Sequence, residues 1–180
     1  EIARAIVQAG GRALVASAGG PNVARLTRVG AEHIDLPLDS KKPWTILANR
    51  HRLRALIGRE KVSLVHARSR APAWSAGPAA RASGVPFVTT YHGSYNEGSW
   101  FKKRYNRIMV SADRVIAIST FIAGLIRQRY GTPDDSVRII HRGADLDIFR
   151  PSAVGAGRLI KLQRAWGIQE DTRVILLPAR

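Results

Sequence analysis

Apolar residues along the chain follow two alternating spacings. Short, continuous apolar runs bounded by turn residues predict strands at 13–17, 33–36, 62–66, 86–90, 114–118 and 137–140. Apolar residues three or four positions apart predict helices at 2–9, 23–29, 44–59, 71–82, 101–110 and 120–130. Helices that alternate with continuously apolar strands indicate an α/β fold, with a parallel sheet covered by helices on both faces.

The pattern changes near residue 150, where Phe149, Pro151 and Gly155 interrupt it. One further helix and one apolar strand are predicted, at 158–166 and 174–177. The sequence therefore predicts a first domain at 1–150. Residues 151–180 read as a linker and the first strand of a truncated second domain. The chain opens within helical spacing and without an initiator methionine, so we expect the sequence to continue at both ends.

Composition narrows the function classes only in part. The 180 residues are 45% hydrophobic and 23% charged, which is ordinary for a globular domain. The absence of cysteine excludes disulfides, thiolate nucleophiles and zinc–sulfur sites. No apolar run approaches the roughly 18 residues that a membrane span needs. The net charge of +16 favours polyanionic partners such as nucleic acid, anionic lipid or phosphorylated substrates, but a solvated basic surface explains it equally well.

Histidines, arginines and hydroxyl residues follow several predicted strands. In open parallel sheets, ligands bind at the carboxyl ends of the strands, so these residues are candidates for a binding cleft. The candidates for acceptor or anion binding are His66, Arg68, Ser69, Arg70, Tyr91, Ser119 and Arg142. Arginine binds phosphate or carboxylate through paired hydrogen bonds, and helix N-termini add backbone donors. The structural alternatives are an ordinary helix cap for Ser119 and a surface charge for Arg70.

Several familiar active sites are absent from the sequence. No glycine-rich dinucleotide fingerprint follows a strand, and there is no P-loop. A nucleophile elbow is also missing, and the histidines form no metal-binding pair. No two carboxylates stand out as a general acid and base. The sequence therefore predicts no metal site.

Four segments in the same order resemble glycosyltransferase family 4, whose enzymes have the GT-B fold. They read VSLVHARSRAP at 62–72, PFVTTYHG at 86–93, DRVIAIS at 113–119 and IIHRGADLDIFRP at 139–151. Residues 173–180, RVILLPAR, are similar to the opening of the family's donor domain. The chain departs from the family at His141 and Arg142, where relatives commonly have proline and asparagine.

The resemblance implies the fold and the reaction. The fold would be the N-terminal, acceptor-side Rossmann-like domain of GT-B, without its first strand, which would lie between the strands at 13–17 and 62–66. The reaction would be the retaining, hexosyltransferase-type transfer of a sugar from a nucleotide diphosphate sugar to an acceptor hydroxyl, with neither cofactor nor metal. His92 would be the catalytic residue that touches the donor sugar. Gly93 and Arg180 would bind the donor, with Arg180 on its diphosphate.

The resemblance also implies partners and a location. The acceptor would be an envelope glycan or a lipid-linked intermediate such as one of lipopolysaccharide synthesis. The enzyme would be cytoplasmic, or peripheral on the inner face of the cytoplasmic membrane, with no specific nucleic-acid partner. This chain alone would be inactive. The alternative function is a basic α/β module that binds nucleic acid or phosphosugars without transfer.

A short basic and aromatic segment suggests contact with an anionic membrane. The aromatic and cationic residues in it are Trp100, Phe101, Lys102, Lys103, Arg104, Tyr105 and Arg107. Faces of this composition bind anionic headgroups. The alternative is a solvated helix whose aromatic side chains lie in the core.

Overall fold

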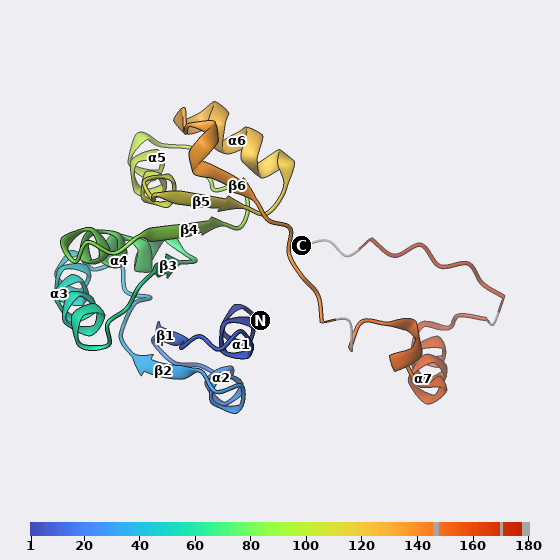
Figure 1. Cartoon of the computed structure of the whole chain (residues 1–180). Helices are drawn as coiled ribbons and strands as arrows, with labels where there is room; N and C mark the ends of the chain where they lie inside the picture. The colour runs from blue at the N-terminus through green and yellow to red at the C-terminus, as the bar shows by residue number, and fades with distance from the viewer. Residues whose placement is uncertain (146–147, 170, 178–180) are drawn as a thin grey trace. The chain divides into compact units, whose positions relative to one another are not determined.

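The computed structural model describes residues 1–145, 148–169 and 171–177. They form two compact units, the first at 1–141 and the second from residue 142 onward (Figure 1). The boundary predicted at residue 150 stays a prediction.

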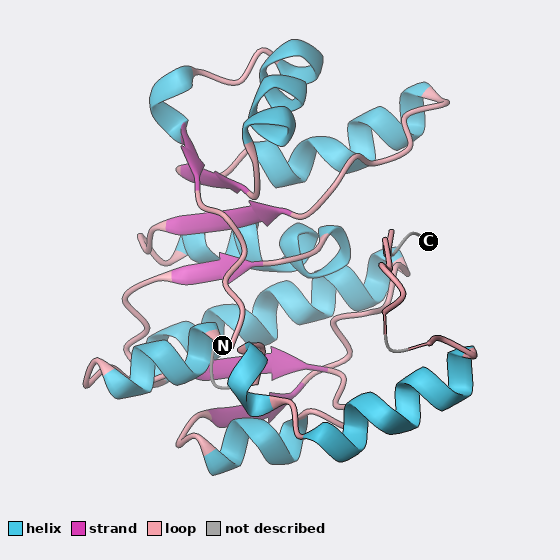
Figure 2. Ribbon diagram, turned by 90° about the vertical axis from the view of Figure 1, so that its right-hand side faces the viewer, coloured by secondary structure: helices cyan, strands magenta, loops and turns pink. Residues whose placement is uncertain are grey.

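The first unit alternates helices with parallel strands. Its helices are α1 (Ile2–Gln8), α2 (Val23–Arg28), α3 (Pro43–Arg59), α4 (Arg70–Ala82), α5 (Trp100–Asn106) and α6 (Thr120–Tyr130). Its strands are β1 (Leu14–Ser17), β2 (Glu32–Asp35), β3 (Val65–Ala67), β4 (Phe87–Tyr91), β5 (Arg114–Ala117) and β6 (Val137–Ile139). Short 3₁₀ helices cover Arg107–Val110 and Asp134–Ser136. Parallel strands with helices packed against them confirm the predicted fold class (Figure 2).

The strands form two separate sheets. β1 pairs with β2, and β3, β4, β5 and β6 pair in that order. Within the described residues β1 and β3 do not pair, in line with the expectation that these two strands are not neighbours. Side chains link the two parts instead. Arg12, just before β1, forms an ion pair of 2.9 Å with Glu60 after α3, and the Asn49 amide of α3 donates to the Pro37 carbonyl at 2.8 Å.

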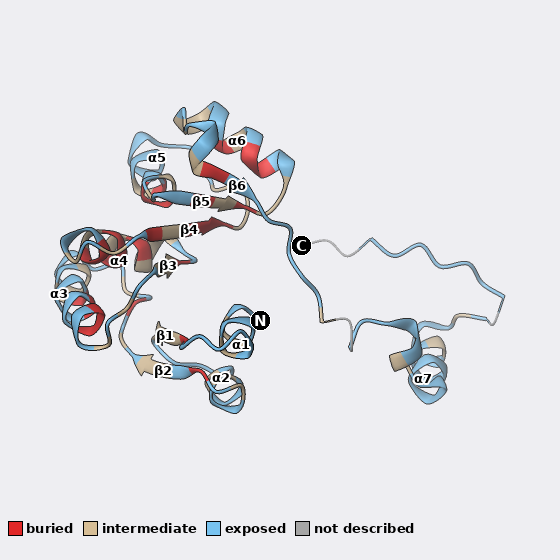
Figure 3. Cartoon of the chain, viewed as in Figure 1, coloured by how far each residue is buried: buried red, intermediate tan, exposed pale blue. Residues whose placement is uncertain are grey.

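The core lies where α4 and α6 cover the four-stranded sheet (Figure 3). Ala73, Ala79 and Ala80 of α4 have no exposed surface, because small side chains let this helix approach its neighbours closely. At Gly77 a β-carbon would lie 2.9 Å from Cε1 of Phe87, so the helix and β4 meet with no room for a methyl group. Close packing therefore holds α4 against β3 and β4.

The second unit contains the helix α7 (Ala156–Trp166), preceded by a 3₁₀ turn at Pro151–Ala153. Gly167 ends α7 in the left-handed conformation, with φ of 63°. Residues 174–177 form no strand and are exposed, and the strand predicted there as the first of a second domain stays a prediction. A strand needs a neighbour to accept its backbone hydrogen bonds, and the described residues of this unit provide none.

Candidate functional site

His66 joins the ends of two neighbouring strands. It lies in β3, opposite Val88 of β4, and its Nε2 is 2.7 Å from Oγ1 of the buried Thr90. Burial lowers the pKa of His66, and the nearby Arg68 and His92 lower it further. Both effects favour the neutral imidazole. Because β3 and β4 pair in parallel, with Ala67 opposite Thr89, the two strands end at the same edge of the sheet.

His92 and Gly93 directly follow β4, and both are half-buried. A β-carbon on Gly93 would meet no atom within 4 Å, so open space lies beside this turn. The roles predicted for His92 with the donor sugar and for Gly93 with the donor stay predictions.

The loop that continues from His92 is tied to two helices. The Arg129 guanidinium of α6 donates to the Tyr95 carbonyl at 3.1 Å. The Asn106 amide, at the end of α5, donates to the Asn96 carbonyl at 3.2 Å. Further along the loop, the hydroxyl of Tyr130 donates to the carboxylate of Glu97. These contacts fix the path of the chain immediately after His92.

Arg70 sits in an aromatic cradle at the start of α4. Its guanidinium carbon is 4.4 Å from the ring centre of Tyr95 and 5.7 Å from that of Tyr105. Its Nη1 donates to Oδ1 of the fully buried Asn106 at 2.7 Å. Cation–π contacts and a hydrogen bond to a buried acceptor hold the charge in a fixed place. Arg70 is therefore more than a solvated surface charge.

The Tyr105 hydroxyl has no hydrogen-bond partner within the described part of the chain, although it is buried. Burial raises the pKa of Tyr105, and the charge of Arg70 opposes this rise. Ser69, which precedes α4, likewise makes no capping hydrogen bond with its side chain. Within the described residues, the Tyr105 hydroxyl therefore has no hydrogen-bond partner and the Ser69 hydroxyl does not cap α4, and both lie beside Arg70.

A hollow of about 510 Å³ opens between the exit of β1 and the start of α4. Its lining is Ala16, Ser17, Ala18, Gly19, Leu38, Asp39, Lys41, Ser69, Arg70, Ala71, Pro72 and Tyr105. Gly19 and Gly20 have φ of 83° and 127°, values that glycine adopts without strain, so the chain turns sharply at this rim. The lining combines two cations, one carboxylate and several hydroxyls. This chemistry suits a polar ligand that carries hydroxyl and anionic groups.

Sequence reasoning placed Ser69 and Arg70 in the site but missed other lining residues. Asp39 and Lys41 follow the exit of β2, so the strand predicted at 33–36 was the signal that could have found them, and Tyr105 was assigned to a membrane-facing helix. Ser17 had one signal, since it precedes the glycine pair Gly19-Gly20. Its Oγ is 2.8 Å from Nε2 of His33, and it accepts from the Gly19 amide at 3.3 Å.

Other predicted site residues lie elsewhere. Tyr91 has no exposed surface, so its side chain packs in the core, with its ring 4.4 Å from that of Tyr95. The Ser119 hydroxyl caps α6 by accepting from the Ile122 amide at 3.2 Å. Arg142 belongs to the second unit, and Arg180 lies outside the described residues.

The described residues were compared with the requirements of a metal site and of a membrane span. They contain no group of three side chains that could hold a metal ion. None of their helices is both long and apolar enough to cross a membrane.

Comparison with known proteins assigns the chain to a family. The model of glycosyltransferase family 4 matches residues 1–148. A solved glycosyltransferase from Rickettsia africae ESF-5 is 34% identical over 99% of this chain, with a TM-score of 0.81. HepE from Anabaena, solved with UDP-glucose, is 17% identical over 92% of the chain, with a TM-score of 0.68. A sucrose-phosphate synthase from Thermosynechococcus elongatus is 16% identical over 94%, with a TM-score of 0.67. No curated protein matches.

The chain spans somewhat under half of each of these solved structures, at 47%, 44% and 46% of their lengths. The two more distant likenesses concern the fold alone. The family match, by contrast, runs from α1 through β6 and includes every element that borders the hollow. With this match, and with one solved relative above 30% identity along nearly its whole length, the chain belongs to glycosyltransferase family 4.

Proposed function

We propose that this chain is the acceptor-side part of an enzyme that transfers a sugar from a nucleotide diphosphate sugar to an acceptor hydroxyl. The observation that carries the proposal is the convergence of strand exits. The exit of β1 and the start of α4 line one hollow, and His66 and His92 stand on the neighbouring exits. Family membership supports transfer chemistry, and the UDP-glucose complex of the related HepE fold supports a nucleotide-sugar donor.

The hollow is the proposed place of the acceptor. Arg70 and Lys41 supply positive charge there, while Asp39 and the serine hydroxyls suit sugar hydroxyl groups. An acceptor that carries both phosphate and hydroxyls, as a lipid-linked envelope glycan does, matches this set. We accordingly place the enzyme in envelope glycan or glycolipid synthesis, in the cytoplasm or on the inner face of its membrane.

For the chemistry, we propose a hexose donor and transfer with retention of configuration at the anomeric carbon. The leaving diphosphate would be stabilised by positive side chains and a helix N-terminus, which act on the charge that develops in the transition state. Arg180 and residues of the donor domain would supply these groups, so this chain by itself would be inactive. The reaction would need no metal, and a chelator should leave the turnover of the full-length enzyme unchanged.

The test is a histidine substitution in the full-length enzyme, assayed by release of the nucleotide. His92→Ala should lower kcat/KM by about tenfold or more, which corresponds to about 1.4 kcal/mol of transition-state stabilisation. The matched control is His51→Ala, because His51 is exposed on α3 and lines none of the site. Unchanged kcat/KM in His92→Ala, or an equal loss in the control, would remove His92 from the reaction.

A further inference from the structure

Two large aromatic side chains project from the start of α5. Trp100 and Phe101 are 66% and 75% exposed, and their ring centres are 5.0 Å apart at an interplanar angle of 76°. Ser99 caps the helix just before them by accepting from the Lys102 amide at 3.3 Å. The alternative that these rings lie in the core is therefore wrong for both. Of the three aromatic residues on this helix, Tyr105 alone is half-buried and packs against Trp74.

Positive charge surrounds these rings. A pocket of about 320 Å³ between α5 and the end of α6 is lined by Trp100, Lys103, Arg104, Arg107, Arg129 and Tyr130. Among the described residues, Lys103, Arg104 and Arg107 have no carboxylate within ion-pair distance. Of the carboxylates that the structure describes, Glu97 alone contacts this group: it accepts from the Tyr130 hydroxyl and lies 3.7 Å from Arg129. The surface is therefore strongly and locally cationic.

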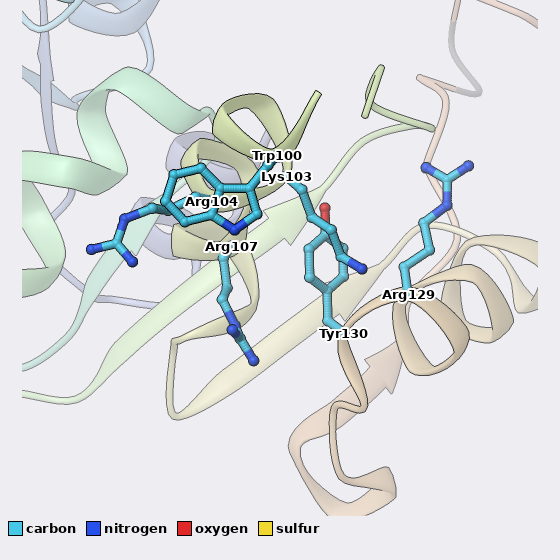
Figure 4. Close-up of a pocket in the computed structure, with 6 residues that line it drawn as sticks. All are labelled: Trp100, Lys103, Arg104, Arg107, Arg129 and Tyr130. Carbon is cyan, nitrogen blue, oxygen red and sulfur yellow. The ribbon is translucent and has the colours of Figure 1, made fainter. Parts of the chain in front are cut away.

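The geometry favours an extended anionic surface over a single small anion. Figure 4 shows the cationic side chains spread from Arg104 on α5 and Arg107 just after it across to Arg129 on α6, with no common point between them. A free phosphate would need these groups to converge on it. An array of headgroup phosphates needs them spread over a face.

The rings favour a bilayer over nucleic acid. The Arg104 guanidinium lies 5.8 Å from the ring centre of Trp100, and Phe101 packs against Trp100 edge to face. A base stacks on a free ring face, and the Arg104 guanidinium already lies over one face of Trp100. Tryptophan and phenylalanine that project beside cations instead suit the boundary between headgroups and acyl chains.

We propose that the face formed by α5 and the end of α6 binds the anionic surface of a phospholipid bilayer. Trp100 and Phe101 enter the headgroup region, and Lys102, Lys103, Arg104, Arg107 and Arg129 lie against lipid phosphates. This attachment deepens the membrane location suggested above but does not need the transfer reaction. Lipid binding measured without donor or acceptor therefore fails or succeeds independently of catalysis.

The test is co-sedimentation of the full-length protein with vesicles of phosphatidylcholine alone or with added phosphatidylglycerol. We expect binding to the anionic vesicles only, weakened by salt because exposed charges are screened. Lys103→Gln/Arg104→Gln should weaken it at least about tenfold, since each cation near the surface contributes to attraction. Trp100→Ala/Phe101→Ala should reduce the binding that survives at high salt.

Two control variants separate the position of the charge from its amount. Arg25→Gln/Arg28→Gln removes the same charge from exposed positions on α2 and should bind normally, as should the charge-preserving Lys103→Arg/Arg104→Lys. Equal binding to neutral and anionic vesicles would overturn the proposal, and so would an equal loss in the α2 variant. A single-stranded RNA that displaces the protein from vesicles, and binds it more tightly through Lys103 and Arg104, would also overturn it in favour of nucleic acid.

Discussion

Asn106 is the buried polar residue that ties the loop after His92 to Arg70. Its Oδ1 accepts from Arg70 at 2.7 Å, and its Nδ2 donates to the Asn96 carbonyl at 3.2 Å. We predict that Asn106→Ala destabilises the fold and lowers turnover together, because one side chain serves both the loop and the cationic centre of the hollow.

The magnitude follows from the two hydrogen bonds. A hydrogen bond to a charged group contributes about 1.5–3 kcal/mol, and one between neutral groups contributes about 1 kcal/mol. Arg70 is half-buried and borders the hollow, so water replaces part of what it loses. The expected net cost to the free energy of unfolding is roughly 2–3 kcal/mol.

The measurement is urea unfolding of the full-length protein, with the change read from the midpoint at constant slope. Asn22→Ala is the matched control, because Asn22 is exposed and its side chain makes no capping hydrogen bond, so it should cost less than about 0.5 kcal/mol. The double variant Arg70→Ala/Asn106→Ala should be less destabilised than the sum of the single variants, since the two residues share one bond. Strict additivity, or a cost in Asn106→Ala no larger than the control, would refute this account of the network.

Two further substitutions test the core and the strand ends. Gly77→Ala should destabilise by roughly 1 kcal/mol in urea unfolding, because the clash with Phe87 at 2.9 Å outweighs the gain in helix propensity, whereas Gly124→Ala, with nothing within 4 Å, should be neutral or stabilising. His66 has a pKa below its ordinary value of 6.5, so its neutral form contributes stability that is present above pH 6.5 and is lost as the pH falls through the folded-state pKa. His66→Gln keeps a hydrogen-bonding partner for Thr90 but cannot titrate, and its urea midpoint should fall less than that of the wild type on acidification below pH 6.5. An identical pH dependence in both proteins would refute the assignment to His66.

Local signals predicted the helices and strands well wherever they marked both ends of an element. The helix at 120–130 was predicted with the bounds it has, because Ser119 caps its start and Gly131, at φ of 64°, ends it. The strand predicted at 62–66 begins later, at Val65. Lys61 adopts φ of 52°, and the Val62 amide donates to the Ile57 carbonyl, so these residues close α3 before the strand can start.

Site residues could be predicted from the sequence only where they directly follow a predicted strand. Strand exits identified Ser69 and Arg70, because a parallel sheet places all its carboxyl ends at one edge. The cradle around Arg70 depends on contacts between α4, the loop after β4 and α5, which no local pattern encodes. For the same reason the sequence did not distinguish the half-buried ring of Tyr105 from the exposed ring of Trp100, since α5 is too short for its apolar period to fix a face.

The two walls of the hollow differ in how they are held. The wall formed by Ser69 and Arg70 rests on α4, which packs on the four-stranded sheet. The wall formed by Ser17 and Gly19 rests on the two-stranded sheet, which does not pair with the other sheet. An ion pair, an amide hydrogen bond and the packing of Ala16, Ile34 and Leu36 against the core join it to the rest. Exposed ion pairs contribute little to stability, whereas a paired strand contributes hydrogen bonds along its whole length. A ligand that contacts both walls would stabilise the arrangement described above by mass action, so the acceptor would help to hold together the site that binds it.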